Sequence, residues 1–437
     1  MTLVLALLAL SACAADPTSS GPTDATDATE ATDAAARVTT IPANCEIPPG
    51  EPFLDTETVE VAEIGEVDGV TVSAALYPHP GYEGNPWSQW GQGIVADDRF
   101  YSAIGDHLSV DGNSYLYEYD PSTGQLALAG DVLSYVDHVP GTWGYGKIHS
   151  QMVPGPCGEI YFSTYWGSFR DIEFEGNYRG DILFRLDPYA RTLAPLGVPV
   201  EFHGQASLGS DPSAGLVYGE AVDPVLRNED IERGPFFVYD VVSEQTVFTG
   251  PDEPHVGYRS VLVDAEGSAY YSMGGAELAT YDPASGESGV HGSTLPGDWL
   301  RAATNPGPDG SVYGVTEDPA VLFAMRPDGS VESLGDALGY TASVALDPDG
   351  SRFFYMPGAH GNSADWGSPL IAVDTATGDE KVLTELNELV EGALGYKVGG
   401  TYGITVSPDG DTVYMGVNVS EDDSGFGEVA LLVLGLP

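Results

Sequence analysis

The sequence predicts an all-β protein, a seven-bladed β-propeller with four-stranded blades and a ring closed by an N-terminal strand. The 437-residue chain has 56 glycines and 32 prolines, which favour short strands joined by many turns. A hairpin of two alternating apolar runs around a tight turn occurs seven times. Each of the first six copies is followed by a second hairpin, and four strands per repeat are typical of propeller blades.

Residues 1–12 are predicted to be a lipoprotein signal peptide, because they are almost wholly apolar and too short to span a bilayer. The segment Leu10-Ser11-Ala12-Cys13 resembles the lipobox of bacterial lipoproteins, in which cleavage before the Cys leaves a thiol that takes a diacylglycerol. Cys13 is therefore the expected lipidation site, with an ordinary signal peptide as the alternative. The basic residue that usually precedes the apolar run is absent, which leaves a translation start upstream of Met1 open.

Composition and cysteine usage divide the rest of the chain. Residues 13–44 are dominated by Ala, Thr, Asp, Pro and Ser and are predicted to be a lipidated, disordered acidic tether. Residues 45–437 are expected to form a single propeller domain. The expected location is extracytoplasmic, with the lipid in the bacterial membrane at the outer membrane or the cell surface. In that oxidising compartment Cys45 and Cys157 can form a disulfide, and two separate free thiols are the alternative.

The net charge of −51, from 66 acidic and 15 basic residues, argues against nucleic acid and anionic membrane surfaces as partners. Contact with the membrane is expected through the lipid anchor alone, and the chain is expected to be a monomer. Such a surface suits a saline habitat, where salt screens the self-repulsion. Scattered Ca²⁺ binding is compatible with it, although no loop of EF-hand spacing is present and no other cofactor or metal site is predicted.

The repeats can be placed one after another along the chain. The inner hairpins begin at Trp90, Lys147, His203, Tyr258, Leu300, Tyr340 and Thr401. The outer hairpins begin at Leu116, Leu183, Phe237, Leu278, Leu322 and Leu370. Many of their turns carry Asp, Pro and Gly, as in DPSTG, because type I turns favour Asp at the start, Pro at fixed φ and Gly at positive φ.

The seventh repeat predicts how the ring closes. Its third strand, GEVALLVLGLP from Gly427, runs to the last residue and leaves no fourth strand. The segment TETVEVAEIG from Thr56 has the alternation that the missing strand requires. Pairing of these two segments would remove the exposed sheet edges of an open ring.

Loop lengths identify one face of the propeller as the functional face. Turns within the hairpins are short, whereas the connections on the opposite face are long. The long connections are 105–114, 131–146, 167–181, 222–234, 357–368 and 385–400. Binding residues usually lie on long loops carried by a rigid scaffold, so we expect the site on this face.

The same face holds the starting ends of the innermost strands, which surround the central channel. The candidates at this mouth are His149, His203, Tyr258, Arg259, Arg301 and Tyr402. Cations gathered at one mouth form a local anion site even in an acidic chain. The alternatives are structural: the His side chains can bond neighbouring carbonyls, the Arg side chains can pair with blade carboxylates, and the Tyr side chains can be packing residues.

Three more residues are candidates for ligand binding. Trp166 and Trp366 are placed either as sugar-stacking platforms or as caps over blade cores. His360, in GAHGNSADWG, lies in a loop that overlooks the channel, and its alternative role is in the structure of that loop.

Parts of the chain resemble known proteins. The segments KIHSQMVPGPCGEIYFSTYWGS, YMPGAHGNSADWGSPLIAVDTATG and GGTYGITVSPDGDTVYMGVN look like stretches of secreted seven-bladed propellers of environmental bacteria, over most of residues 85–437. More distantly, the architecture and channel are similar to those of ulvan lyases, which cleave an acidic polysaccharide by β-elimination. This resemblance implies proton transfer by His and Tyr and neutralisation of the uronate by Arg. The matching positions are His149, His203, Tyr258, Arg259 and Arg301.

Two functional hypotheses from different classes follow. The first is an enzyme, a polysaccharide lyase that acts on an acidic glycan at the channel mouth. The second is a lipid-tethered propeller that binds a glycan or a partner protein and performs no reaction. A lactone hydrolase with a channel metal is a weaker third possibility, because acidic ligands are absent from the strand starts. No Ser/His/Asp triad motif, phosphate-binding glycine loop or HExxH is present.

Overall fold

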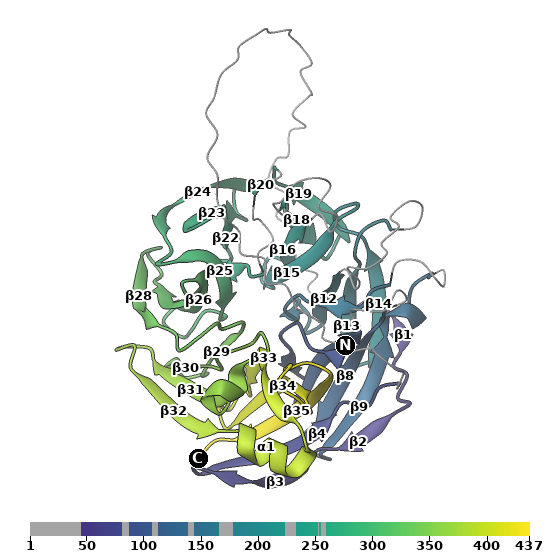
Figure 1. Ribbon diagram of the computed structural model, residues 1–437. Coiled ribbons are helices and arrows are strands. Elements are labelled where there is room, and N and C mark those ends of the chain that lie inside the picture. The colour runs from purple at the N-terminus through teal and green to yellow at the C-terminus, as the bar shows by residue number, and fades with distance from the viewer. Residues whose placement is uncertain are drawn as a thin grey trace, which may run out of the picture. The chain divides into compact units, whose positions relative to one another are not determined.

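Seven antiparallel sheets surround a central axis and form a seven-bladed β-propeller with four-stranded blades, which confirms the predicted fold class (Figure 1). The computed structural model describes residues 45–80, 87–106, 112–138, 144–165, 178–222, 233–251, 253–254 and 259–437. Three predicted functional positions, Cys13, Trp166 and Tyr258, lie outside the described residues.

In the first two blades the innermost strand is divided into two short pieces that pair with the same neighbour. Blade 1 consists of β5 (Trp87–Ser88), β6 (Ile94–Ala96), β7 (Arg99–Asp106), β8 (Ser114–Asp120) and β9 (Gln125–Asp131), followed by the 3₁₀ helix η1 (Val132–Ser134). Blade 2 consists of β10 (Lys147–Ile148), β11 (Val153–Pro154), β12 (Ile160–Tyr165), β13 (Leu183–Asp187) and β14 (Thr192–Gly197).

The next four blades have four strands each, in sequence order from the axis outward. Blade 3 is β15 (Gly204–Asp211), β16 (Leu216–Val222), β18 (Phe236–Asp240) and β19 (Gln245–Thr249), with a separate pair β17 (Arg233–Gly234) and β20 (Glu253–Pro254). Blade 4 is β21 (Leu262–Val263), β22 (Ala269–Ser272), β23 (Glu277–Asp282) and β24 (Glu287–Thr294). Blade 5 is β25 (Asp298–Ala303), β26 (Val312–Asp318), β27 (Val321–Met325) and β28 (Val331–Asp336). Blade 6 is β29 (Val344–Leu346), β30 (Arg352–Tyr355), β31 (Pro369–Asp374) and β32 (Glu380–Glu385).

Two of the long connections contain helical turns. The 3₁₀ helix η2 (Ser363–Trp366) lies between β30 and β31, and the helix α1 (Asn387–Leu394) joins blade 6 to blade 7. In α1, Val390 is buried and packs against the cluster between these two blades. Gly395 ends the helix in the left-handed conformation, at φ 80°, that glycine adopts without strain.

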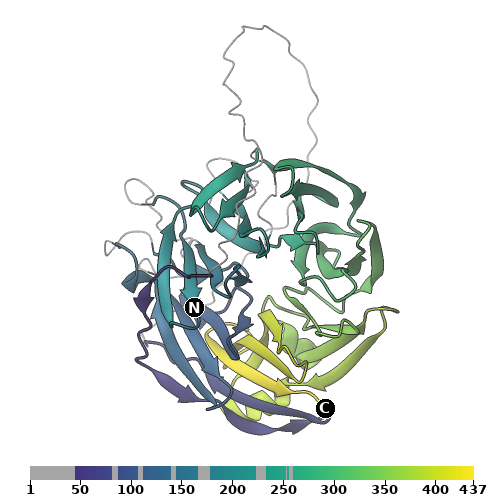
Figure 2. The same cartoon turned by 180° about the vertical axis from the view of Figure 1, so that it is seen from behind.

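Blade 7 joins the two ends of the chain. Its strands are β33 (Lys397–Val406), β34 (Thr412–Ser420), β35 (Glu428–Gly435), β4 (Val70–Leu76) and β3 (Ala62–Val67). In Figures 1 and 2 the purple N-terminal strands lie beside the yellow C-terminal strands. Closure by an N-terminal strand is therefore confirmed.

The prediction of which N-terminal segment closes the ring was wrong. β35 pairs with Val70–Leu76 and not with the stretch from Thr56. The physical reason lies in the side chains that face the blade core. Val70 and Val72 are buried in that core, whereas Glu60 and Glu63 are exposed and could not take such a position without a large desolvation cost.

The earlier N-terminal strands instead cover outer sheet edges. β1 (Glu51–Pro52) pairs with β14 of blade 2, β2 (Thr58–Glu60) pairs with β9 of blade 1, and β3 pairs with β4 of blade 7. One continuous segment thus adds a fifth strand to three consecutive blades and protects edges that could otherwise pair with another chain.

The core consists of apolar layers between neighbouring blades. Within the described residues there are seven large clusters, one for each pair of adjacent blades. Aromatic rings stack across several of these interfaces: Phe100 lies on Tyr414 with centroids 4.9 Å apart, and Phe236 lies on Tyr271 at 4.2 Å. The rigid ring that results fixes the innermost strands around the channel.

A disulfide joins the segment that precedes β1 to the hairpin turn of blade 2. Cys45 and Cys157 are bonded, with Cα atoms 5.3 Å apart and 112 positions apart in the sequence. The bond closes a long loop and holds the segment before β1 at blade 2.

Candidate functional site

On the face where the innermost strands begin, residues of several blades form one cluster of cations and aromatic rings, which we call the mouth cluster. Its members come from blades 1, 2, 4, 5, 6 and 7 and are linked by ring contacts, cation–π contacts and electrostatic interactions. The mouth cluster consists of Trp90, Lys147, His149, Tyr165, Arg259, Arg301, Tyr340, His360, Tyr402 and Phe426. The structure thus brings together five of the residues singled out in the sequence: His149, Arg259, Arg301, His360 and Tyr402.

Arg301 is held by the neighbouring blade. It lies on β25, its residue is only 2% exposed, and its Nε donates a hydrogen bond of 2.6 Å to Tyr340 Oη. Its Nη1 donates to the carbonyl of Ala342 at 3.1 Å, and its guanidinium lies 5.7 Å from the centre of the Tyr402 ring. The buried Nη2 forms no hydrogen bond within the described part of the chain. The Nη2 amino group, with its two N–H donors, is therefore left for a ligand or water.

His149 is buried and neutral. Desolvation and the positive charges of Arg259, Lys147 and Arg301 lower the pKa of its imidazole well below 6.5. Its Nδ1 lies 2.8 Å from the carbonyl of Ala206 on β15, and a carbonyl can only accept, so Nδ1 carries the hydrogen. Nε2 is then the unprotonated nitrogen, which can accept a hydrogen bond or a proton.

Lys147 places another cation of the mouth cluster among aromatic rings. It lies on β10, two positions before His149, which directly follows that strand. The residue is buried, and its Nζ lies 4.3 Å from the centre of the Trp90 ring and 5.9 Å from that of Tyr165. Cation–π attraction stabilises an ammonium in this position.

Arg259 completes the set of cations and has an unusual backbone conformation. Its φ of 95° is positive, which is rare for a residue other than glycine and is often found at functional sites. Gln151 donates from Nε2 to the Arg259 carbonyl at 3.1 Å and accepts at Oε1 from Leu208 N, also at 3.1 Å. Burial disfavours the charged guanidinium, but the nearby Tyr340 and Glu317 outweigh it and raise its pKa. Arg259 therefore stays charged.

His360 forms the outer part of the mouth cluster. Its ring stacks on Tyr340 with centroids 4.1 Å apart, while the residue keeps an exposed edge. Desolvation and the charges of Arg259 and Arg301 lower its pKa to about 4. His360 is therefore neutral near pH 7, like His149.

Two predicted residues lie apart from these contacts. His203 is in the turn before β15, partly exposed, with its Nδ1 2.8 Å from the Glu201 carbonyl. The ring contacts that join the mouth cluster do not reach His203 in the described part of the chain. Trp366, in η2, is half-buried with its ring against Gly339, the residue before Tyr340.

Several members of the mouth cluster were missed by the sequence analysis. Lys147 lies two positions before the predicted residue His149, so the period of two along an extended segment could have identified it. Phe426 comes from a loop of blade 7 and stacks on Trp90 at 5.6 Å, a contact for which the sequence carries no signal.

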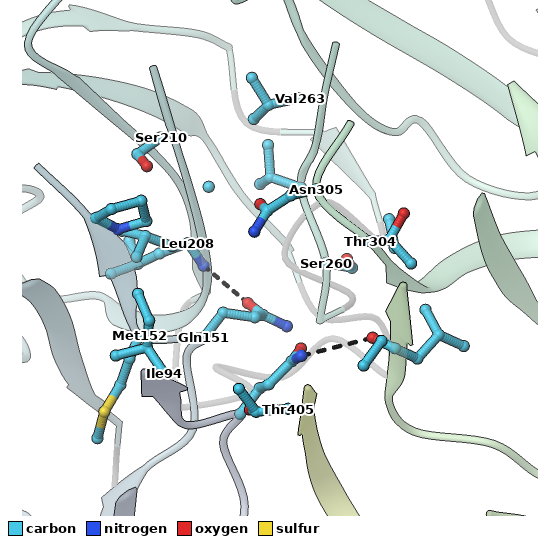
Figure 3. Close-up of a pocket in the computed structure, with 18 of the residues that line it drawn as sticks. Ile94, Gln151, Met152, Leu208, Ser210, Ser260, Val263, Thr304, Asn305 and Thr405 are labelled. Carbon is cyan, nitrogen blue, oxygen red and sulfur yellow. Dashed lines mark hydrogen bonds between the residues drawn. The ribbon is translucent and has the colours of Figure 1, made fainter. Parts of the chain in front are cut away.

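Beyond the mouth cluster the channel contains a neutral polar cavity of about 170 Å³ (Figure 3). Its walls are residues that follow the mouth residues along the innermost strands, including Gln151, Ser260, Thr304, Asn305 and Thr405. No charged side chain is among the residues that line it. Cations are thus confined to the mouth, and the channel beyond offers amides, hydroxyls and apolar walls.

Two other features are absent from the described residues. No group of three or more His, Cys, Asp or Glu side chains is arranged there to hold a metal ion. Among the helices of the same residues, none has the length and apolar character needed to cross a membrane.

The comparison with solved structures gives distant matches. A structure of U3-55K matches at a TM-score of 0.52 and 10% identity, covering 83% of this chain and 98% of that one. Selenomethionine-substituted virginiamycin B lyase from Staphylococcus aureus matches at a TM-score of 0.49 and 9% identity, covering 84% and 100%. No family model and no curated protein sequence matches the chain. Likeness at this level of identity shows the fold alone.

Proposed function

We propose that the mouth cluster binds the carboxylates of an acidic polysaccharide. The observation that carries this proposal is the convergence of Lys147, Arg259 and Arg301 among aromatic rings at one mouth of a chain with a net charge of −51. Cations are scarce in this chain, and their concentration at one mouth creates a local positive field. Glu317 is a carboxylate whose charge acts on Arg259 and raises its pKa.

The aromatic rings favour a sugar over a small inorganic anion. Trp90, Tyr402 and Phe426 pack together, with Trp90 4.9 Å from Tyr402 and 5.6 Å from Phe426. Trp90 and Phe426 are partly exposed and supply apolar surface for the C–H faces of a pyranose, while guanidinium groups pair with its carboxylate. Tyr402 is buried and packs against Trp90. A uronic acid residue presents both features.

β-Elimination is the second candidate function, and the state of His149 favours it. The imidazole of His149 keeps Nε2 unprotonated and able to accept the C5 proton of a uronate, while burial and the three neighbouring cations, which lower its pKa, make it a weaker base. The electron pair of the C5–H bond forms the C4=C5 double bond as the C4–O bond breaks. The cations stabilise the charge that develops on the carboxylate.

Tyr340 can supply the proton that the leaving oxygen takes. Its oxygen accepts a hydrogen bond from Arg301 Nε, so its own hydroxyl hydrogen can be donated elsewhere. Tyr258, the donor suggested by the sequence, lies outside the described residues. Without such chemistry, the same cluster would serve the alternative function of a binding protein for a glycan or a partner protein.

Calorimetric titration with tetra-galacturonate tests the binding proposal. Arg301→Gln should weaken the affinity by about 10- to 100-fold, because a charged hydrogen bond to the ligand is lost. Arg326→Gln is the matched control: this residue is on the same blade but in the turn on the opposite face, paired with Glu332 at 3.0 Å. Equal affinities for both variants and the wild type would refute the proposal.

Absorbance at about 235 nm, where an unsaturated uronide absorbs, tests β-elimination in the same samples. His149→Ala should abolish the rise in absorbance, while His291→Ala, on the outer strand β24, should leave it unchanged. Tight binding with no rise for the wild type would reject the lyase and retain the binding function.

The proposed location is extracytoplasmic, with the chain anchored through a lipid on Cys13. The Cys45–Cys157 disulfide supports an oxidising compartment. Mass spectrometry of the N-terminal peptide from a membrane fraction should show the diacylglycerol, and Cys13→Ser should release the protein from the membrane. Retention of the Cys13→Ser variant in the membrane fraction would contradict lipid anchoring.

A further inference from the structure

A second group of exposed side chains lies on the same face as the mouth cluster, at the boundary of blades 2 and 3. Arg179 precedes β13, in the connection between the second and third strands of blade 2. Phe202 and His203 precede β15, in the connection between the two blades. Both connections belong to the face on which the innermost strands begin, because alternate strands run in opposite directions. Arg179, Phe202 and His203 are called the rim group below.

The rim group is held in place by its backbone. Phe202 N donates to the Arg179 carbonyl at 2.7 Å, and Asp181 N donates to the His203 carbonyl at 2.9 Å. Gly180, at φ 123°, permits this close approach, since a Cβ there would lie 2.4 Å from Val198 Cγ1. The two connections are therefore fixed to each other before any ligand binds, which lowers the entropy cost of binding.

Phe202 is exposed in a way that packing does not explain. The residue is 40% exposed and has a φ of 62°, in the left-handed region that bulky side chains avoid. The guanidinium of Arg179 lies 5.8 Å from the centre of its ring. Arg179 is itself exposed and forms no ion pair within the described residues, in a protein with 66 acidic side chains. An exposed ring beside an exposed guanidinium has the same chemistry as the mouth cluster.

The distance between the two sites suits an extended ligand. His149 of the mouth cluster bonds the carbonyl of Ala206, and Ala206 is three residues after His203 on the same chain segment. At about 3.3 Å per residue, the rim group begins roughly 10 Å from this anchor point. A single sugar ring at the mouth would not reach it, whereas a chain of several rings would.

We propose that the rim group is a second subsite for the same acidic glycan, in which Phe202 stacks on a sugar ring and Arg179 pairs with its carboxylate. This inference rests on the proposed function, and it adds that the ligand is an oligosaccharide whose affinity increases with chain length. His203, whose Nδ1 lies 2.8 Å from the Glu201 carbonyl, presents its other ring nitrogen as a hydrogen-bonding group at this subsite.

The test compares galacturonate with tetra-galacturonate by calorimetric titration. The variants are Phe202→Asn, because Asn tolerates the left-handed conformation, and Arg179→Gln. The control is Tyr189→Ala, which removes an exposed ring, 60% exposed, from the turn between β13 and β14 on the opposite face of blade 2. Each rim variant should weaken binding of the tetrasaccharide by roughly tenfold and leave the monosaccharide unchanged.

The outcomes separate this inference from the proposed function. If the wild type binds tetra-galacturonate and both rim variants bind it equally well, the subsite is wrong and the proposed function stands. If a rim variant weakens the monosaccharide and the tetrasaccharide by the same factor, the rim group acts on the mouth cluster and is no separate subsite. If the wild type binds neither sugar, the proposed function fails and the subsite fails with it.

Discussion

Asp181 gives the sharpest prediction about stability, because it is a fully buried carboxyl group among neutral neighbours. Its side chain accepts hydrogen bonds of 2.8 Å from Thr164 Oγ1 and from Tyr178 Oη. Desolvation outweighs these bonds and raises its pKa from 3.8 to about 7. The folded state thus binds the proton more tightly than the unfolded chain does.

The sign and size of the effect follow from this shift. A raised pKa contributes stability that is fully present below pH 3.8 and is lost as pH rises through about 7. A difference of about 3 pKa units corresponds to about 4 kcal/mol. Between pH 4 and pH 8 the unfolding free energy of the wild type should therefore fall by up to about 4 kcal/mol more than that of Asp181→Asn.

Urea unfolding of the wild type and of Asp181→Asn at several pH values measures this difference, since all the other carboxyl groups cancel in the comparison. Asp365→Asn, at an exposed position in η2, is the control and should show the pH dependence of the wild type. If the wild type and Asp181→Asn lost stability in parallel over this range, Asp181 would have a charge-stabilising partner, and the assignment of a neutral buried carboxyl group would be refuted.

Three further predictions concern the ring and the site. Reduction of the Cys45–Cys157 disulfide, which spans 112 positions, should lower the unfolding free energy by up to about 4–5 kcal/mol, and an unchanged urea midpoint would contradict this. Val72→Asp should abolish cooperative unfolding, because it places a charge in the core of the strand that closes the ring; a sharp transition measured by circular dichroism would show that closure does not need β4. Gln151→Ala should weaken tetra-galacturonate binding several-fold, because it releases the Arg259 carbonyl, and a titration with wild-type affinity would remove Gln151 from the site.

The fold could be predicted from the sequence because its repeats carry both the turn chemistry and the apolar alternation. In the turn at Asp120, for example, the side-chain Oδ1 accepts from Ser122 N at 2.9 Å, and Gly124 has a φ of 69°, as the DPSTG pattern predicts. The closing strand was misplaced because alternation alone does not distinguish a strand that fills a core from one that covers an edge. The acidic side chains in the segment from Thr56 were the signal against burial.

The mouth cluster could be predicted in part. Aligning the inner hairpins places His149, Arg259 and Arg301 at equivalent positions of different blades, and a closed ring brings equivalent positions together. The hydrogen bond from His149 to Ala206 and the burial of Asp181 depend on how blades 2 and 3 pack, which no local pattern specifies. His203 was expected at the mouth as well, but it lies apart from the mouth cluster because the turn before β15 directs its ring to Glu201.

The central claim is that the mouth binds sugar carboxylates, and the most direct measurement is a pair of calorimetric titrations of the wild type. One uses tetra-galacturonate and the other its carboxyl-reduced counterpart, a neutral tetrasaccharide of the same length and shape. Recognition by Lys147, Arg259 and Arg301 predicts binding of the acidic sugar, weakened by added salt, with no detectable binding of the neutral one. Equal affinity for both sugars, or binding of neither, would contradict it.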